Sequence, residues 1–213
     1  MRTTHFLRLA PAVLTVALLT AGCATDTAPQ YYSLAEVGAP RQPAGDREKA
    51  APLFIELAPI AMADRFARPQ MVVRKKHDPA SPAVDILEDH RWSSSFDNEL
   101  RDALASSIAS RLGAVDVTLS GRQRGQPATR IAIQMGQFDA VEGSRVDASF
   151  TWTLRRTDEG PVTGCQFSIS EPVGGGFDAL AQGAQRVAAR LAEAIAGSVS
   201  ALKADQPSAC TAA

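Results

Sequence analysis

The sequence contains few of the residues from which catalytic and metal sites are usually built. It has 3 histidines and 3 cysteines in 213 residues, and aromatic side chains make up only 6%. No Gly-x-Ser-x-Gly nucleophile motif, no His-x-x-x-His pair and no cysteines at zinc-ligand spacing occur. Gly174-Gly175-Gly176 lacks the Lys and Ser/Thr of a phosphate-binding loop and predicts a flexible turn. We therefore expect no catalytic site, no metal and no cofactor.

The charge balance argues against nucleic acid as a partner. Lys and Arg number 22 and Asp and Glu 23. Loss of Arg2 and Arg8 with a leader peptide would leave 20 against 23, a net charge of −3. A nucleic-acid-binding protein needs a strongly basic face, which this balance does not favour.

The stretch Leu9–Cys23 predicts export. It is apolar and follows two arginines, but it is shorter than the about 20 residues of a spanning helix, which is typical of a signal peptide. Ala21-Gly22-Cys23 resembles the bacterial lipobox, whose cysteine is acylated and becomes the new N-terminus, although Thr20 stands where Leu is usual. We expect residues 1–22 to be a lipoprotein signal peptide and Cys23 to carry lipid. The alternative is a plain signal peptide with a chance cysteine.

Residues 23–30 are expected to form a lipidated tether. The seven residues after Cys23 reach at most about 24 Å when extended, so the domain is expected to lie against its membrane. In enterobacterial lipoproteins, Asp directly after the acylated cysteine causes retention in the inner membrane. Ala24 stands at that position here and resembles the default, which is transfer to the outer membrane. The expected location is the periplasmic face of the outer membrane.

The remaining pattern predicts one domain over residues 31–202 and a C-terminal tail over 203–213. Apolar residues every three or four positions predict two long helices, one between Trp92 and Gly113 and one from about Asp178 to Leu202. Alternating, β-branched or aromatic stretches predict strands. They are residues 31–37, 53–62, 70–75, 84–88, 115–119, 130–141, 145–156 and 164–170. The fold class is α/β: a single compact domain with a mixed β-sheet of seven to eight strands flanked by two long helices, part of it parallel.

Several local interpretations accompany this fold. Ser94 and Asp97 fit a capping box before the first helix. Asp85, Glu88, Asp89 and His90 could form an acid–base cluster, but a solvated strand end is the simpler interpretation. The basic run of residues 74–76 could contact lipid headgroups or could be a solvated turn.

Two cysteines remain once Cys23 carries lipid. In an oxidising compartment an isolated pair such as Cys165 and Cys210 tends to form a disulfide. The bond would close a loop of 45 residues (210 − 165), worth about 4 kcal/mol in the chain-entropy description. Two independent thiols are the alternative.

A series of short motifs resembles a known family. In chain order they are Tyr31-Tyr32-Ser33-Leu34, Leu57-Ala58-Pro59-Ile60, Asp64-Arg65, Arg68-Pro69-Gln70-Met71-Val72, Trp92, Phe96-Asp97-Asn98-Glu99-Leu100, Leu104, Phe138-Asp139, Gly143 and Trp152-Thr153-Leu154. This order resembles the ABC-type transport auxiliary lipoproteins, the family that includes paraquat-inducible protein C. Trp92-Ser93-Ser94-Ser95-Phe96 departs from the Trp-Ala-Glu-Pro-Leu often found there, and the loop of residues 38–52 is long.

The resemblance implies a non-enzymatic subunit. Such lipoproteins are outer-membrane partners of a system that moves lipid between the two membranes, together with an ATPase, a permease and a periplasmic protein with MCE domains. Some members form rings, so a homo-oligomer is an expectation. Two other hypotheses remain open: a structural or assembly lipoprotein of the outer membrane or cell envelope, and an exported hydrolase with an unrecognised site.

Contact with an MCE-domain partner is expected from surface loops, because loops on a rigid scaffold often carry binding function. The candidates are Asp64, Arg65 and Arg68 around Phe66, and the turn at residues 142–144. An exposed aromatic side chain between arginines suits an interface anchor. Phe66 suits the core equally well.

Overall fold

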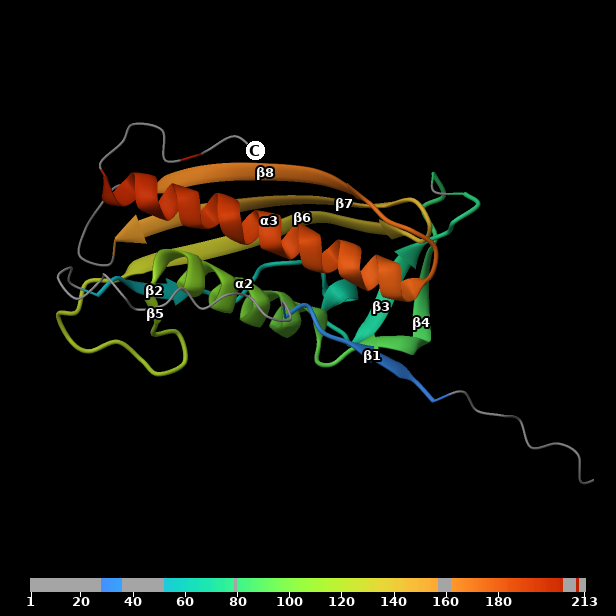
Figure 1. Ribbon diagram of the computed structural model, residues 1–213, viewed down its shortest axis with the longest axis horizontal. Helices are drawn as coiled ribbons and strands as arrows, with labels where there is room; N and C mark the ends of the chain where they lie inside the picture. The colour runs from blue at the N-terminus through green and yellow to red at the C-terminus, as the bar shows by residue number, and fades with distance from the viewer. Residues whose placement is uncertain (1–27, 36–51, 79, 157–161, 205–209, 211–213) are drawn as a thin grey trace, which may run out of the picture.

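Two helices cover one face of an eight-stranded mixed β-sheet (Figure 1). The computed structural model describes residues 28–35, 52–78, 80–156, 162–204 and 210. In chain order the elements are β1 (Gln30–Tyr32), β2 (Phe54–Leu57), the 3-10 helix η1 (Asp64–Phe66), β3 (Gln70–Arg74), β4 (Val84–Trp92), α2 (Phe96–Leu112), β5 (Val115–Asp116), β6 (Thr129–Val141), β7 (Arg145–Arg156), β8 (Thr163–Pro172) and α3 (Phe177–Lys203). The predicted α/β fold class, with a mixed sheet and two long helices, is confirmed.

Some of the sequence predictions concern residues outside these ranges. The signal peptide, Cys23, most of the tether and most of the C-terminal tail are not among the described residues. None of the helices in the described part of the chain is long and apolar enough to cross a membrane.

The sheet is arranged around β6. One edge of β6 pairs antiparallel with β7 along its whole length, and β7 pairs antiparallel with β8. Two strands share the other edge of β6. β2 pairs parallel with the first residues of β6, and Arg74 of β3 pairs with Val141 at the end of β6. The chain passes from β4 through α2 to β5, which lies parallel to β2. The predicted parallel part of the sheet is therefore present.

A bulge in β6 keeps its apolar side chains on the helical face. Ile131, Ile133 and Met135 are buried as the alternation predicts. The register with β7 then shifts between Met135 and Gln137. This shift adds one residue, so Phe138 and Ala140 are also buried on the helical face.

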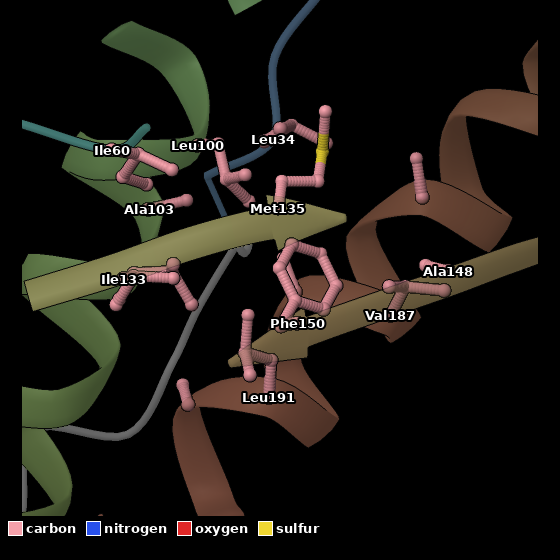
Figure 2. Packing of buried hydrophobic residues seen from close by; sticks show 14 of the residues in the cluster. Leu34, Ile60, Leu100, Ala103, Ile133, Met135, Ala148, Phe150, Val187 and Leu191 are labelled. Carbon is pink, nitrogen blue, oxygen red and sulfur yellow. The ribbon is translucent and has the colours of Figure 1, made fainter. Parts of the chain in front are cut away.

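The core lies between this face and the two helices (Figure 2). Leu191 and Val187 of α3 pack beside Phe150 of β7, while Leu100 of α2 lies near Met135. Small residues bring α3 close to its neighbours: a Cβ added at Gly183 would lie 2.2 Å from Cγ1 of Val173. The alanine-rich sequence of α3 thus permits a close approach to the sheet side of the domain.

The first long helix begins differently from the sequence prediction. Its N-cap is Ser95, whose side chain makes no capping hydrogen bond. Ser94 instead donates to Glu99, and Oδ1 of Asp97 is buried without a hydrogen-bond partner among the described residues. The predicted Ser94–Asp97 capping box is therefore wrong, because the Ser94 hydroxyl donates to the Glu99 carboxylate and does not cap the helix. The C-terminal prediction is confirmed, since Gly113 has a φ of 58° in the left-handed region.

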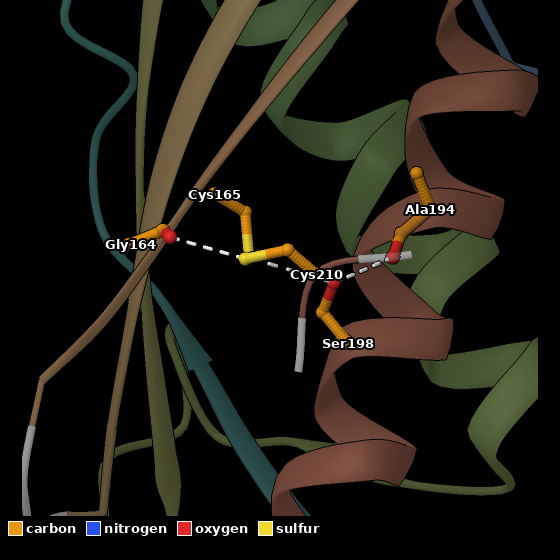
Figure 3. Close-up of a disulfide and its surroundings, with 5 residues drawn as sticks. All are labelled: Gly164, Cys165, Ala194, Ser198 and Cys210. Carbon is orange, nitrogen blue, oxygen red and sulfur yellow. Dashed lines mark hydrogen bonds between the residues drawn. A yellow bond between two sulfur atoms is a disulfide. The ribbon is translucent and has the colours of Figure 1, made fainter. Parts of the chain in front are cut away.

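The structure joins Cys165 of β8 to Cys210 of the tail, with Cα atoms 5.3 Å apart (Figure 3). Cys165 is buried and faces α3, where its sulfur lies 3.8 Å from Oγ of Ser198. The Cys210 sulfur lies 3.0 Å from the Gly164 carbonyl oxygen. A disulfide sulfur has no hydrogen to donate, so this is a packing contact. It places Cys210 between the start of β8 and α3.

Candidate functional site

The loop around η1 carries the predicted partner-binding residues. Phe66 at its centre is only 5% exposed. Its ring meets the ring of Phe138 edge-on at a centroid distance of 6.1 Å and lies 6.2 Å from that of Phe96. Of the two sequence interpretations of Phe66, the structure therefore supports the core residue. Phe66 is not an exposed interface anchor, because its ring fills the space between β6 and α2.

The polar side chains of this loop differ in accessibility. Asp64 and Arg65 are exposed, and the guanidinium carbon of Arg65 lies 4.5 Å from the centroid of the Phe66 ring. Arg68 is half-buried, and its carbonyl oxygen accepts a 3.1 Å hydrogen bond from the backbone N–H of Phe96. The loop is thus fixed to the start of α2. Asp64 and Arg65 are its side chains best placed to meet another protein.

The aromatic cluster leaves almost no free space. A cavity of about 20 Å³ lies beside Phe66, Trp92, Phe96 and Phe138. That volume holds roughly one water molecule. The cluster therefore serves packing and offers no room for a lipid chain.

A larger hollow lies near the far end of α3. It is an open groove of about 320 Å³, bordered by residues of β2, β6 and β7. Leu53, Phe54 and Val199 contribute to an apolar lining, and Arg156 and Lys203 are its charged residues. The volume is near the lower end of the about 300–1,000 Å³ typical of small-molecule sites. Among the described residues that line this groove there is no histidine, carboxylate or thiol.

The β6–β7 turn at residues 142–144 is the second predicted contact site. Gly143 has a φ of 68°, as a tight hairpin turn requires. Glu142 accepts a 3.0 Å hydrogen bond from the backbone N–H of Gly176, and Nζ of Lys76 lies 3.6 Å from its carboxylate. The turn is therefore bound to the loop before α3 and to the β3–β4 turn.

The structure also assembles a site that the sequence analysis did not predict, which we call the N-terminal clasp. Residues 32–34, directly after the predicted tether, bind both helices and β4. The Tyr32 hydroxyl donates to Oδ1 of Asp178 at 2.8 Å, and the Ser33 carbonyl oxygen accepts from Gln185 at 2.7 Å. Leu34 is only 1% exposed and lies in the core. The clasp comprises Tyr32, Ser33, Leu34, His90, Ser93, Glu99, Asp178 and Gln185.

Glu99 provides the buried charge of the clasp. Its carboxylate accepts hydrogen bonds from the Leu34 backbone N–H at 2.9 Å, from Ser33 at 3.1 Å, and from Ser93 and Ser94. Burial by itself raises the pKa of Glu99, but the donors from Ser93, Leu34, Ser33 and Ser94 outweigh it, so the pKa is lowered. The carboxylate is thus held in its ionised form.

The hydrogen bonds of Tyr32 also determine which nitrogen of His90 carries a proton. The single hydroxyl proton of Tyr32 is donated to Asp178, so Nδ1 of His90, 3.0 Å from the same oxygen, must be the donor there. The His90 ring packs on Phe177 of α3 at a centroid distance of 4.1 Å. Burial, the hydrogen bond to Asp178 and its negative charge raise the pKa of Tyr32 to about 12. Tyr32 therefore remains a donor throughout the physiological pH range.

The acid–base cluster considered from the sequence is not assembled. His90 faces Tyr32 and Phe177, whereas Glu88 faces Arg91, 3.0 Å away, and Gln70. Asp85 and Asp89 are exposed on β4, as a solvated strand end would have them. No group of three or more metal-binding side chains occurs in the described part of the chain.

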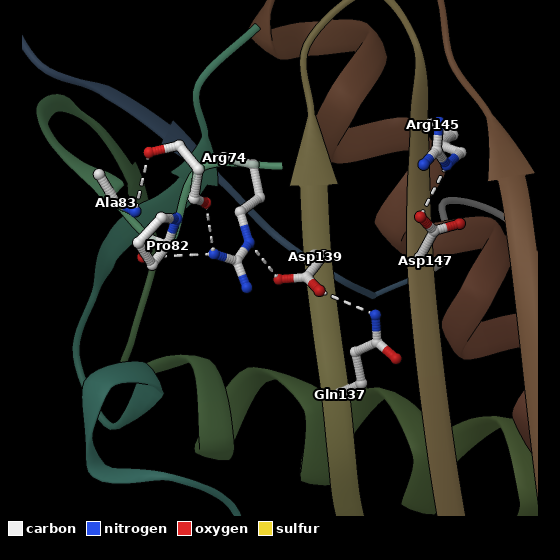
Figure 4. Close-up of polar contacts among 8 residues, drawn as sticks. Arg74, Pro82, Ala83, Gln137, Asp139, Arg145 and Asp147 are labelled. Carbon is white, nitrogen blue, oxygen red and sulfur yellow. Dashed lines mark hydrogen bonds and ion pairs between the residues drawn. The ribbon is translucent and has the colours of Figure 1, made fainter. Parts of the chain in front are cut away.

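Two of the three cations in the basic run at residues 74–76 have carboxylate partners. Nε of Arg74 lies 2.7 Å from Asp139, on the face of the sheet opposite the helices (Figure 4). Gln137 donates to the other oxygen of the same carboxylate at 2.8 Å. Lys76 faces Glu142, and Lys75 is exposed. The run is thus largely neutralised, which favours the interpretation as a solvated turn.

The clasp could have been found only in part from the sequence. In the sequence, Tyr31-Tyr32-Ser33-Leu34, Trp92 and the segment containing Glu99 are separate motifs. Nothing in their spacing shows that they meet. The only local signal is a carboxylate beside the apolar stripe of α2, preceded by the serines of residues 93–95.

The described residues form an α/β domain with two helices on one face of a mixed sheet, and the acid–base cluster considered from the sequence is not assembled among them. Residues 32–196 match the family described as the ABC-type transport auxiliary lipoprotein component. The chain belongs to this family of transport auxiliary lipoproteins, which is not a class of enzymes. The expected family resemblance is confirmed.

Solved structures show the same fold. A crystal structure of an uncharacterized protein aligns with a TM-score of 0.63 and 17% identity, covering 81% of this chain and 99% of that one. The DUF330 protein XCC0632 from Xanthomonas campestris aligns with a TM-score of 0.56 and 14% identity, covering 84% of this chain and 97% of its own. No curated protein gives a significant match.

Proposed function

We propose that this protein is the lipid-anchored docking subunit of an MCE-type ABC transport system. Lipid on Cys23 holds the domain at the periplasmic face of the outer membrane. There it binds the periplasmic MCE-domain protein while lipid moves between the inner and outer membranes. Family membership supports the transport association, and the location and the partner are the parts proposed here.

The observation that carries the proposal is the N-terminal clasp. Residues 32–34 are fixed to β4, α2 and α3 directly after the tether. The lipid anchor would therefore hold a rigid domain, with at most about 24 Å of extended chain between Cys23 and Gln30. Such an arrangement suits a fixed station at one membrane better than a carrier that crosses the periplasm.

Metabolic labelling tests the anchor. A palmitate analogue should label the wild type and should not label Cys23→Ser, with sucrose-gradient fractionation reporting which membrane holds the protein. Equal labelling of both proteins would contradict lipidation at Cys23. Recovery in the inner-membrane fraction would contradict the outer-membrane location alone.

The docking surface is tested at Arg65, because this side chain is exposed whereas Phe66 is not. A photoreactive amino acid at position 65 should crosslink to the MCE-domain protein. Arg65→Glu should weaken the crosslink and the complementation of a deletion strain, scored by detergent sensitivity. Arg190→Glu, which reverses an exposed charge on α3, is the matched control. Complementation by Arg65→Glu, with no crosslink from position 65, would remove this surface from the proposal.

The deletion strain also separates the main alternative. If the protein were a structural or assembly lipoprotein, its deletion should damage the envelope but leave the MCE complex intact. The transport proposal requires that the MCE complex itself lose activity or a subunit. An unchanged complex would overturn it.

A further inference from the structure

Exposed apolar side chains gather on the two strands nearest the tether. Tyr31 of β1 is 63% exposed, and Val84 and Ile86 of β4 are 37% and 42% exposed. By contrast, the described residues of α2 and α3 include no exposed large apolar side chain. At this end of the molecule the accessible apolar surface therefore belongs to strands β1 and β4 (Figure 1).

Strand geometry places these three side chains on the face of the sheet opposite the helices. Tyr32 donates a hydrogen bond to α3, so its neighbour Tyr31 points to the other face. Val84 pairs with Arg74, whose side chain lies on that face (Figure 4), and Ile86 follows two residues later on the same face. We call Tyr31, Val84 and Ile86 the tether-side patch.

The charged side chains beside the tether-side patch form an ion pair. Arg91, the β4 partner of Tyr31, lies 3.0 Å from the Glu88 carboxylate, which also accepts a 3.2 Å hydrogen bond from Gln70. Lys75, directly after β3, is exposed. The apolar groups of the patch are therefore accompanied by a neutralised ion pair and not by a block of like charges.

Two aspartates of β4 are also exposed. Asp85 pairs with Val73, which is buried on the helical side, so Asp85 lies on the face away from the patch. Asp89 falls where the register between β3 and β4 shifts. A surface that meets this part of β4 should therefore offer ammonium groups as well as apolar groups, as a layer of phosphatidylethanolamine does.

We propose that the tether-side patch is the face with which the domain rests on the bilayer that holds its anchor. This inference rests on the proposed lipidation of Cys23. Tyr31 directly follows Gln30, so the chain of at most about 24 Å that leads from Cys23 ends beside the patch. A tyrosine suits the boundary between headgroups and acyl chains, because its ring is apolar and its hydroxyl is polar. The apolar side chains of Val84 and Ile86 enter the same boundary layer.

Photocrosslinking tests the contact with the full lipidated protein in vesicles of phosphatidylethanolamine and phosphatidylglycerol. A photoreactive amino acid at position 86 should crosslink to phospholipid, which mass spectrometry of the crosslinked protein detects. The same amino acid at position 190, exposed on α3, is the matched control and should give little lipid adduct. Equal lipid adducts from both positions would overturn the proposal, because the domain would then have no preferred face. A crosslink from position 86 to a second copy of the chain would overturn it by assigning the patch to an interface between copies.

Two charged substitutions test the patch itself, with the photoreactive amino acid kept at position 86. Tyr31→Asp with Val84→Asp should lower the ratio of membrane-docked to free domains about tenfold or more, because two exposed apolar groups are replaced by charges. The lipid adduct from position 86 should fall accordingly. Gln182→Asp with Ser200→Asp adds the same charge on the exposed side of α3 and should leave the adduct unchanged. Tyr31→Trp should also keep it.

Palmitate labelling of the same samples separates this inference from the proposed anchor. A labelled protein that gives no lipid adduct from position 86 would overturn the membrane-facing patch and leave the anchor in place. An unlabelled protein would overturn both. A lipid adduct that survives Tyr31→Asp with Val84→Asp would also remove the patch from the contact. In intact cells, a crosslink from position 86 to another protein in place of lipid would assign the face to that protein and overturn the proposal.

Discussion

The backbone N–H of Leu34 donates a 2.9 Å hydrogen bond to Oε2 of Glu99. This contact links the segment after the predicted tether to a carboxylate on α2, 65 residues further along the chain. Leu34 itself is buried, so hydrogen bonding and apolar burial hold the same residue. If Cys23 carries lipid as proposed, any pull on that anchor would therefore act on the core of the domain and not on a loose strand.

Glu99→Gln should destabilise the fold by about 1–3 kcal/mol, because an amide cannot accept from four donors as a carboxylate does, and its NH₂ group would face hydroxyl groups. The effect should depend on pH. The folded pKa of Glu99 is lowered below its ordinary 4.5, so the stabilisation is present above pH 4.5 and is lost as pH falls through the folded pKa. Urea unfolding of both proteins should show their difference shrinking below about pH 4.5. A difference that is constant down to pH 3 would contradict this account.

Tyr32→Phe tests the other side of the clasp. The variant loses the hydrogen bonds to Asp178 and His90 and should lose about 1 kcal/mol at neutral pH. The folded pKa of Tyr32 is raised to about 12 from 10.0, so its contribution is present below pH 10 and disappears as pH rises towards 12. Absorbance at 295 nm should show a tyrosinate titrating near pH 12 in the wild type and not in Tyr32→Phe. The protein has 2 tyrosines, so the signal of Tyr32 is the difference between the wild type and Tyr32→Phe, and a difference that titrates near pH 10 in the folded protein would contradict the role of Asp178.

Apolar residues at helical spacing, and alternating apolar and polar residues in the strands, predicted most of the fold. The apolar stripe of α3 can be identified from local spacing alone. The predicted helix, from about Asp178 to Leu202, is one residue shorter at each end than the observed helix, Phe177–Lys203. Predictions that needed a distant partner were weaker. Pro59 interrupts the predicted strand at residues 53–62, which pairs regularly with β6 only as far as Leu57. The clasp was missed for the same reason, since Glu99 is buried by Ser33 and Leu34 from the other end of the chain.

Phe66 illustrates the limit for the candidate site. Arginines on both sides of an aromatic residue suit an exposed anchor, and from the sequence the core was an equal alternative. The choice depends on Phe96 and Phe138, which lie 30 and 72 residues further on and enclose the ring. Local sequence contains no measure of that enclosure.

Alkylation of thiols tests the predicted bond between Cys165 and Cys210. Without reductant, neither cysteine should react in denaturant, and reduction should expose both. Cys210→Ser should lower stability by up to about 4 kcal/mol, because the 45-residue loop in the unfolded chain is no longer closed. Cys210 is the better site for substitution, since Cys165 is buried. Alkylation of both thiols in the unreduced, denatured protein would show that the exported chain carries no such bond.

The close approach between α3 and the segment after β8 gives a prediction about packing. Gly183→Ala should improve intrinsic helix propensity by about 1 kcal/mol. It should nevertheless destabilise the protein, because the new Cβ would lie 2.2 Å from Cγ1 of Val173 and 3.4 Å from Cγ2 of Val146. Overpacking of this kind typically costs about 1–3 kcal/mol, and thermal unfolding would measure the net loss.

A double-mutant cycle separates this contact from a general intolerance of α3 to substitution. Val173→Ala removes the methyl groups that the new Cβ would meet, so Gly183→Ala should be less harmful, or even stabilising, in that background. Val146→Ala is the matched control, because its nearest atom to the new Cβ is already at an ordinary van der Waals distance. Rescue by Val173→Ala and little rescue by Val146→Ala would locate the constraint at Val173. Equal costs of Gly183→Ala in all three backgrounds would mean that the helix tolerates the added methyl group by moving as a whole.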